Sequence, residues 1–300
     1  MPIQRINMLP SKKTILIVDD TESNIDMLLA ILKEYDTVVA TNGEDALNIL
    51  EEEAIDLVLL DIVMSGIDGF EVCRRMKNNP NTHKIPVVFI TAKSDEDTIE
   101  EAYSIGGIDY VTKPFKPREL RARVKTHLEF QSMVQHLDFI ASYDMLTGIL
   151  NRRKFFTLSQ ELFETHDNVC AIMIDIDRFK HINDSFGHHG GDIALKSIAQ
   201  SIAHNLSNEA IFGRLGGEEF SILLTNVEER SVMELVEKIR EAIENSEITL
   251  DDATRVHCTI SSGIAMKDAM TKTLDMLLQK ADNAMYEAKE KGRNRSIFRA

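Results

Sequence analysis

The sequence predicts an α/β protein of two domains, the first of which is a doubly wound parallel sheet. In the first 115 residues, short apolar runs alternate with longer amphipathic stretches such as residues 22–34 and 43–53. Strands that are buried on both faces and alternate with helices are typical of parallel sheets. The chain has 300 residues, of which 43% are hydrophobic, and this is enough for about two domains with cores of their own.

Five apolar, β-branched runs are the expected strands of this sheet: residues 14–18, 37–40, 57–60, 87–90 and 109–111. A polar residue follows each of four of them. These residues are Asp19 and Asp20, Asp61, Thr91 and Lys113. Ligands of such sheets bind at the carboxyl ends of the strands. Carboxylates that converge there raise each other's pKa unless a cation is present, and an oxygen-lined pocket suits Mg²⁺.

This set resembles the receiver domain of bacterial response regulators, over residues 12–128. The resemblance implies that Asp61 accepts a phosphoryl group from a histidine kinase or another phosphodonor. It also implies that Asp19, Asp20, Asp61 and the carbonyl group of Val63 hold one Mg²⁺. The family often has proline where this chain has Ser65, a departure that affects the stiffness of a loop.

The same resemblance implies a switch. Thr91 and Lys113 are expected to bind the phosphoryl oxygens, and Tyr110 is expected to be the aromatic residue that changes its rotamer on activation.

Residues 117–142 are expected to form one continuous helix that links the two domains, because no Gly or Pro interrupts them after Pro117. Phe130, Val134, Leu137 and Ala141 step along it by four, three and four residues, which is the spacing of a seam for a partner helix. The alternative interpretation is a stripe that packs on its own domain.

The second domain has an apolar run, residues 170–174, that ends at Asp175 and is followed by Lys180. A buried strand that ends in an acid, with a lysine nearby, has the parts of a metal and phosphate site. The motif RLGGEEF (residues 214–220) is expected to form a hairpin that turns at Gly216 and Gly217. Glu218 would then begin a strand beside Asp175, and the glycines would let a phosphate approach the backbone.

A third cluster spans residues 183–192. The carboxylate of Asp192 can accept two hydrogen bonds from the N1–H and N2–H₂ edge of guanine. The amide of Asn183 suits a base edge that carries both a hydrogen-bond donor and an acceptor. Adjacent histidines such as His188 and His189 rarely chelate one ion. The basic segment AKEKGRNR (residues 288–295) is either a solvated helix end or a group of cations that closes over a triphosphate.

These motifs, together with IDIDRFKHIND, FGHHGGD and DMLTGILNRR, resemble the GGDEF domain of diguanylate cyclases over residues 143–300. The resemblance implies the α/β palm fold of nucleotide cyclases. It implies a reaction that joins two GTP molecules into cyclic di-GMP and releases two pyrophosphates. Each domain would hold one GTP, so a homodimer would be the active form, with phosphorylation of the receiver creating or rearranging it.

The resemblance also assigns roles to single residues. Asp175, the carbonyl group of Ile176 and Glu218 are expected to bind two Mg²⁺ ions, for which Mn²⁺ could substitute, with Glu219 supporting them. Glu218 or a metal-bound water is the expected proton acceptor. The residues expected to bind GTP are Lys180, Asn183, His188, Asp192, Gly216, Gly217, Lys289 and Arg293.

One departure from the family is informative. Many relatives carry an Arg-x-x-Asp site for product inhibition just upstream of the glycines, where this chain has residues 207–210 with the sequence SNEA. Without the arginine and the aspartate, the fork that grips the product is missing. We expect weak or no feedback inhibition through that site.

Composition restricts the alternatives. The net charge of −15 argues against nonspecific DNA binding, and no basic recognition helix supports a DNA-binding regulator. No apolar run is long enough to cross a bilayer, so we expect a cytoplasmic protein without a membrane partner. The three cysteines have no pairing or metal spacing and are expected to be buried. The remaining rivals are a degenerate GGDEF domain that binds GTP or cyclic di-GMP as a signalling module, and a mixed cyclic dinucleotide synthase.

Overall fold

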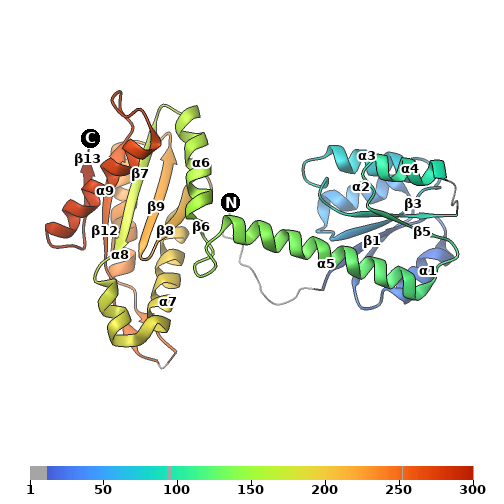
Figure 1. Cartoon of the computed structure of the whole chain (residues 1–300), viewed down its shortest axis with the longest axis horizontal. Coiled ribbons are helices and arrows are strands. Elements are labelled where there is room, and N and C mark those ends of the chain that lie inside the picture. Colours follow the sequence, from blue (N-terminus) through green and yellow to red (C-terminus); the bar gives the residue numbers. More distant parts are fainter. Residues whose placement is uncertain (1–11, 93–95, 252, 300) are drawn as a thin grey trace. The chain divides into compact units, whose positions relative to one another are not determined.

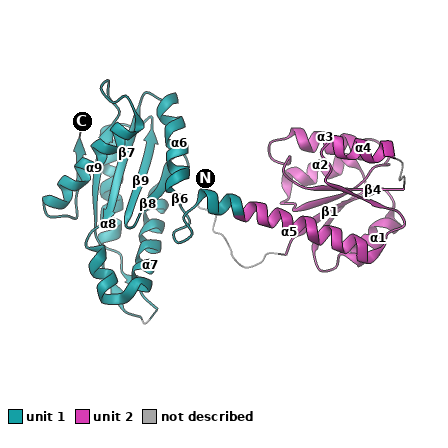
Figure 2. Cartoon of the chain, in the orientation of Figure 1, with its two compact units in different colours: residues 1–5, 137–300 teal, residues 6–136 magenta. Residues whose placement is uncertain are grey.

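The computed structural model describes residues 12–92, 96–251 and 253–299, and the chain divides into two compact units (Figures 1 and 2). In sequence order, the first unit (magenta, unit 2 in Figure 2) ends at His136 and the second (teal, unit 1 in Figure 2) begins at Leu137, so the boundary falls inside the long helix α5 (Pro117–Ser142). Each unit has its own sheet and its own hydrophobic core. The two-domain α/β architecture expected from the sequence is therefore confirmed.

The first unit contains a five-stranded sheet in which every neighbouring pair of strands is parallel. The strands lie in the order β2 (Asp36–Ala40), β1 (Thr14–Val18), β3 (Leu57–Asp61), β4 (Val87–Thr91) and β5 (Asp109–Thr112). The helices are α1 (Glu22–Ile31), α2 (Gly43–Glu52), α3 (Gly69–Asn78), α4 (Glu96–Ser104) and α5. Helices α1 and α5 cover one face, and α2, α3 and α4 cover the other.

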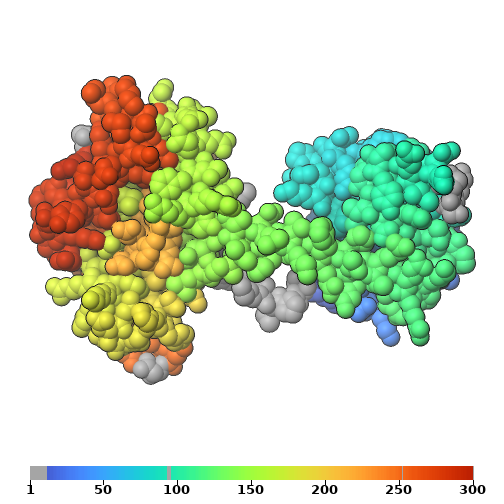
Figure 3. Space-filling view, viewed as in Figure 1, coloured from blue at the N-terminus to red at the C-terminus, as the bar shows by residue number. Residues whose placement is uncertain are grey.

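Helix α5 changes character along its length. Its first half buries Leu120, Val124 and Leu128 against the sheet of the first unit. Its second half carries apolar side chains that are 41–65% exposed: Phe130, Met133, Val134, Leu137 and Ile140. The space-filling view shows the corresponding green stretch of the helix at the surface (Figure 3). The interpretation of this stripe as packed on its own domain is therefore wrong for Phe130, Val134 and Leu137.

The second unit contains a six-stranded mixed sheet, with β7 near its centre and antiparallel to both neighbours. The strands lie in the order β13 (Ser296–Arg299), β12 (Ile260–Met266), β7 (Val169–Ile176), β9 (Glu219–Thr225), β8 (Ile211–Gly216) and β6 (Leu150–Asn151). Helices α7 (Phe179–Asn205) and α8 (Glu229–Glu244) pack on one face, while α6 (Arg152–Thr165) and α9 (Leu274–Glu290) pack on the other. Strands β10 (Ile248–Thr249) and β11 (Arg255–Val256) form a separate small pair.

The three cysteines are free and buried, as expected. Burial raises the pKa of Cys170 to about 12 and that of Cys258 to about 11, so neither is a reactive thiolate at neutral pH. Within the described ranges, no helix combines the length and the apolar character that a membrane span requires.

Candidate functional site

The first unit has a cluster of carboxylates at one edge of its sheet. Strands β1 and β3 are parallel, so Asp19, after β1, and Asp61, at the end of β3, meet at the same edge. Carboxylate oxygens of Asp19, Asp20 and Asp61 all lie within 4.8 Å of one another, and among the described residues this is the one such set of three or more potential metal ligands. With Lys113, these residues form what we call the aspartate site.

Lys113 bridges the two buried acids of the aspartate site. Its Nζ lies 2.8 Å from Asp19 Oδ2 and 2.7 Å from Asp61 Oδ2. Burial raises the pKa of Asp61, and the negative charge of Asp19 adds to this, while the bond to Lys113 offsets part of it. Burial alone would lower the pKa of Lys113, but its hydrogen bonds to both aspartates outweigh that effect and raise it. A hard divalent cation fits this donor set, because it would neutralise carboxylates that one lysine only partly balances.

Neighbouring groups hold these carboxylates in place. Asn24 donates from Nδ2 to both oxygens of Asp19, at 2.9 and 3.0 Å, and the backbone N–H of Ser65 donates to Asp20 Oδ2 at 3.0 Å. The sequence analysis missed Asn24, which lies five residues after Asp19 in the first turn of α1, and no spacing rule connects the two because Asp19 precedes the helix. The Ser65 loop is thus tied directly to the site.

The remaining residues expected in this site are spread around it. Thr91 ends β4 and is 2% exposed. Tyr110 is half-buried on β5 and meets Tyr103 of α4 edge-on, with ring centroids 6.3 Å apart. The backbone N–H of Val63 lies 3.4 Å from Asp61 Oδ1.

In the second unit, the hairpin of RLGGEEF turns one residue later than expected. Its turn consists of Gly217 and Glu218, Gly216 pairs with Glu219, and β9 begins at Glu219. The placement of the turn at Gly216 and Gly217 was therefore wrong. The reason is a bulge between Arg214 and Gly216, which adds one residue to β8 and shifts the register. As a result Glu219, and not Glu218, is the register partner of Asp175 on β7.

The side chain of Arg214 holds this turn in place. Its Nε and Nη2 donate to Gly217 O at 2.9 and 2.7 Å, and its Nη1 lies 3.1 Å from Asp144 Oδ1. Gly217 has a φ of +50°, a left-handed conformation that glycine adopts without strain. Because Asp144 lies two residues after the end of α5, the turn is linked through one side chain to the start of the second unit.

Asp175 is the centre of the second site. The residue is 5% exposed, and burial raises its pKa to about 6, with the charges of Glu218 and Glu219 adding to the effect. Lys289, from α9, offsets part of this because its Nζ lies 2.7 Å from Asp175 Oδ2. We call Asp175, Glu218, Glu219 and Lys289 the hairpin site. Its carboxylates fit divalent cations in kind, although they do not lie as close together as those of the aspartate site.

The two residues expected to bind guanine, Asn183 and Asp192, are brought into the same region by a break in helix α7. Gly187, with a φ of +72°, breaks the helix, so that the chain folds back on itself. A Cβ atom at Gly191 would overlap Asn183 Oδ1, which places the amide of Asn183 beside the residue before Asp192. Asp192 is half-buried and therefore accessible.

Lys180 and His188, which are expected to contact the nucleotide, differ in their surroundings from the neighbouring His189. Lys180 and His188 are exposed. His189 pairs with Asp251 through Nε2 and Oδ2 at 2.7 Å, in line with a loop histidine that binds a neighbour and not a metal.

Asp177 is a residue that the sequence analysis missed. It is 7% exposed, and its carboxylate accepts hydrogen bonds from Thr259 Oγ1 at 2.7 Å, Ser261 Oγ at 2.6 Å and the backbone N–H of Asn294 at 3.0 Å. The second acid of IDID was the available signal. Its partners are far away in sequence, so a local pattern could not identify them.

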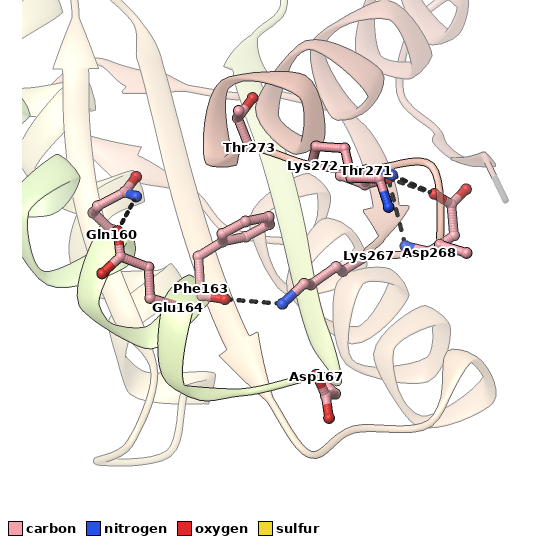
Figure 4. A pocket seen from close by; sticks show the side chains of 10 residues that line it. Gln160, Phe163, Glu164, Asp167, Lys267, Asp268, Thr271, Lys272 and Thr273 are labelled. Carbon is pink, nitrogen blue, oxygen red and sulfur yellow. Dashed lines mark hydrogen bonds between the residues drawn. The ribbon is translucent and has the colours of Figure 1, made fainter.

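A pocket of about 650 Å³ in this unit lies elsewhere (Figure 4). It is at the opposite end of β7 from Asp175, since Lys267, in its wall, donates from its backbone to Val169 O. Lys267 Nζ is already bound to the carbonyl oxygens of Phe163 and His166, at 2.9 and 2.7 Å. This pocket therefore offers no free cation from Lys267 to a ligand, and the hairpin site remains the candidate for chemistry.

Comparison with known families identifies both units. The profile described as "Diguanylate cyclase, GGDEF domain" matches residues 141–295, and that of the "Response regulator receiver domain" matches residues 15–125. The response regulator PleD of Caulobacter vibrioides is 31% identical over 299 residues, covering 95% of this chain and 66% of PleD. Diguanylate cyclase A of Treponema denticola is 35% identical over 159 residues, which are 51% of this chain and 43% of that protein.

Two solved structures from Caulobacter crescentus are similar to the second unit. The GGDEF domain of DgcB in complex with c-di-GMP is 27% identical, has a TM-score of 0.51, and covers 53% of this chain and 95% of its own. A structure of the coiled coil and GGDEF domain of DgcB, also with c-di-GMP, is 27% identical with a TM-score of 0.53, and covers 60% of this chain and 99% of its own.

Proposed function

The chain belongs to the GGDEF family and carries a receiver domain ahead of its GGDEF domain, and we propose that it is a diguanylate cyclase regulated by phosphorylation. The observation that carries this proposal is the hairpin site, where both acids of the GGEEF motif act electrostatically on the buried Asp175. A domain that had lost catalysis and kept only binding would have no need to hold three acids together at a cost in stability. The proposed reaction converts two GTP into cyclic di-GMP and two pyrophosphates.

The residues of the second unit divide the work. Asn183 and Asp192 bind the guanine edge, and Asp192 distinguishes guanine from adenine because adenine lacks the pair of donors it requires. Lys180 and Arg293 bind phosphate oxygens, and both are exposed as this requires. His188 lies on the same segment and contacts the ribose or base.

Asp175, the carbonyl group of Ile176, Glu218 and Glu219 would hold two Mg²⁺ ions, or Mn²⁺ in their place. Bound there, the metal ions would neutralise the triphosphate and favour ionisation of the attacking hydroxyl. Glu218 accepts the proton of the 3′-hydroxyl that attacks the α-phosphate of the second GTP. Lys289 neutralises Asp175 until substrate arrives and then turns to the phosphates. Catalysis of this kind rests mainly on positioning and on charge neutralisation.

The active form is a homodimer. Each chain provides one nucleotide site, and the ring closes only when two such sites face each other. The exposed stripe on α5, from Phe130 to Ile140, offers apolar residues at steps of three and four to the same helix of a second chain. This stripe lies between the aspartate site and the hairpin site in the sequence, and so can pass a change in the first to the second.

The aspartate site is the input. Asp61 accepts the phosphoryl group from a histidine kinase or another phosphodonor, while Asp19, Asp20 and the carbonyl group of Val63 would complete one Mg²⁺ site with it. Thr91 and Lys113 then bind the phosphoryl oxygens, and Tyr110 reports the change to the surface of the receiver domain.

Product inhibition at the site upstream of the glycines is absent. Residues 207–210 form the turn between α7 and β8 and carry no arginine or aspartate. Added cyclic di-GMP should leave initial rates unchanged at micromolar concentrations, and noncompetitive inhibition in that range would show that this chain has another inhibitory site.

Incubation with GTP and Mg²⁺, followed by chromatography and mass determination of the products, tests the proposed activity. We expect one cyclic di-GMP for every two GTP consumed. A chain that binds GTP without consuming it would be a degenerate binding module, and a mixed product from GTP plus ATP would contradict the role of Asp192.

A further inference from the structure

The segment after helix α9 has an unusual backbone. Gly292, Arg293 and Asn294 have φ values of +110°, +64° and +46°, so three consecutive residues are left-handed. The helix end itself needs only the first of them, because Gly292 and Arg293 already return hydrogen bonds to Lys289 O and Ala288 O. For Arg293 this conformation costs about 1 kcal/mol or more, whereas asparagine adopts it more readily than most residues. Contacts outside the helix must therefore offset the cost at Arg293.

Asn294 is held at three points. Its backbone N–H donates to Asp177 Oδ2 at 3.0 Å, its Oδ1 accepts from Arg240 Nη1 at 2.8 Å, and its Nδ2 donates to Glu244 Oε1 at 2.6 Å. These partners come from the end of β7 and from helix α8. Asn294 therefore fastens the turn to two separate elements, with both polar atoms of its side chain used.

The partners are themselves fixed. The carboxylate of Asp177 also accepts from Thr259 and Ser261, at 2.7 and 2.6 Å. The side chain of Arg240 is 11% exposed, and its Nη1 also donates to Glu244 Oε2 at 2.6 Å. A left-handed backbone that is over-determined in this way is a sign of a functional position.

These contacts fix the backbone next to Arg293, whose side chain points to solvent without a partner among the residues described. It is exposed, and in the described part of the chain no hydrogen bond or ion pair of its guanidinium group is found. It lies beside Asn294, whose anchor Asp177 is two residues after Asp175. The backbone conformation of the turn thus sets the direction of the Arg293 side chain. The turn lies at the same end of β7 as the hairpin site.

We propose that Asn294 is a positioning residue for the triphosphate: anchored by Asp177, Arg240 and Glu244, it holds Arg293 in the left-handed conformation that directs its guanidinium group to phosphate oxygens. This inference rests on the proposed function, since it takes GTP as the ligand. Its role is distinct from that of the residues that bind guanine, which lie on α7.

The test is binding of two nucleotides to the full-length chain by calorimetry, with Mg²⁺ present. A GTP analogue with a methylene group between the α- and β-phosphorus atoms reports on the triphosphate, and GMP reports on the guanine contacts. We expect Asn294→Ala to weaken the affinity for the analogue about tenfold, which is about 1.4 kcal/mol, and to leave the affinity for GMP unchanged. Arg293→Ala should lower the affinity for the analogue at least as much. The double variant should bind the analogue no more weakly than Arg293→Ala alone.

Asn226 provides a matched control. It is also a left-handed asparagine, with a φ of +56°, but it follows β9 at the end that pairs with Val169, away from Asp175. Asn226→Ala should lower the thermal midpoint and leave both affinities unchanged. Asn294→Gly should recover the stability lost in Asn294→Ala without recovering the affinity for the analogue, because glycine restores the backbone conformation but not the side-chain bonds to Arg240 and Glu244.

Several outcomes overturn the inference. Equal weakening of both nucleotides would show general damage to the fold, and an unchanged affinity for the analogue would show that Asn294 does not act on the phosphates. Additive losses in the double variant would separate Asn294 from Arg293. A wild-type chain that binds neither nucleotide overturns the proposed function and this inference together, whereas normal wild-type binding with any of the results above overturns the inference alone.

Discussion

The aspartate site and the hairpin site are built from the same parts in different ways. Each has a buried aspartate at the end of a central strand and a lysine that reaches it from a distant element. In the aspartate site one lysine bridges two acids, and three carboxylates lie within 4.8 Å of one another. In the hairpin site the lysine binds a single acid, and the other two acids come from the turn and from the first residue of β9.

Sheet topology explains the difference. Parallel strands bring several strand ends to one edge, so a single unit can assemble a complete cation and phosphate site there. Antiparallel strands alternate in direction. The hairpin between β8 and β9 therefore supplies Glu218 from its turn and Glu219 from the start of β9. We infer that the first site is complete within one chain, and that the second is completed by substrate and by a second chain.

Substitution of Asp61 and substitution of Asp175 should therefore impair different properties, phosphorylation and turnover. This is the largest effect we expect. Asp61→Asn should abolish phosphorylation by acetyl phosphate, measured as the mass shift of the intact protein, and should leave nucleotide affinity unchanged. Asp175→Asn should lower turnover of GTP by at least about 10³-fold, because it removes the buried charge that positions the cations. Its receiver should still gain the phosphoryl mass. Loss of both properties in either variant would contradict the separation of the sites.

Glu218 and Glu219 should differ in how much each contributes to turnover. Glu218→Gln should lower turnover about 10²- to 10³-fold because it removes the proton acceptor, while Glu219→Gln should lower it about tenfold. Initial rates at saturating GTP measure both. The reverse order would show that Glu219, the register partner of Asp175, is the principal acid, and that the roles we assign are exchanged.

The two lysines should differ in what they contribute to stability. Without divalent cations, Lys113→Met should lower the free energy of unfolding by about 3 kcal/mol, since it leaves two buried acids uncompensated. Lys289→Met leaves one acid, which can take up a proton, so its cost should be about 1 kcal/mol.

Thermal unfolding in a chelator measures both lysine variants, and excess Mg²⁺ should restore most of the loss in Lys113→Met. Equal costs for the two variants, or no recovery with Mg²⁺, would show that the aspartate site is not the more highly charged one.

The pH dependence of stability provides the smallest effect. The pKa of Asp175 is raised to about 6, so its contribution to stability is fully present below about pH 4 and is lost as the pH rises through about 6. In a chelator, Asp175→Asn should be more stable than wild type by about 3 kcal/mol at pH 8, and by much less at pH 4. Thermal midpoints across this range measure the difference. A difference that does not change with pH would mean that Asp175 keeps its charge at no cost.

The sequence predicts the aspartate site more completely than the hairpin site, for a physical reason. Strand ends in a parallel sheet follow from local apolar runs, so Asp19, Asp61 and Lys113 could be brought together before the structure was known. The turn of RLGGEEF depends on a bulge before Gly216 and on the grip of Arg214 on Gly217 O. Such contacts are not encoded by spacing.

The same limit applies to buried polar anchors. Asp177 binds Thr259, Ser261 and Asn294, which are 82 to 117 residues away. A sequence pattern identifies an acid of this kind as a strand-end residue, and only the fold shows what it fastens. The exposed stripe of α5 is intermediate, because helical spacing predicts the stripe but not whether it is covered.

Turnover of GTP as a function of receiver activation tests the link between the two sites most directly. Beryllofluoride, a phosphoryl mimic, should raise cyclic di-GMP production by the wild-type chain together with a shift toward the dimer mass in light scattering. Asp61→Asn should show neither change and should keep its basal turnover. If the mimic left turnover unchanged in the wild type, or raised it equally in Asp61→Asn, the aspartate site would not control the hairpin site.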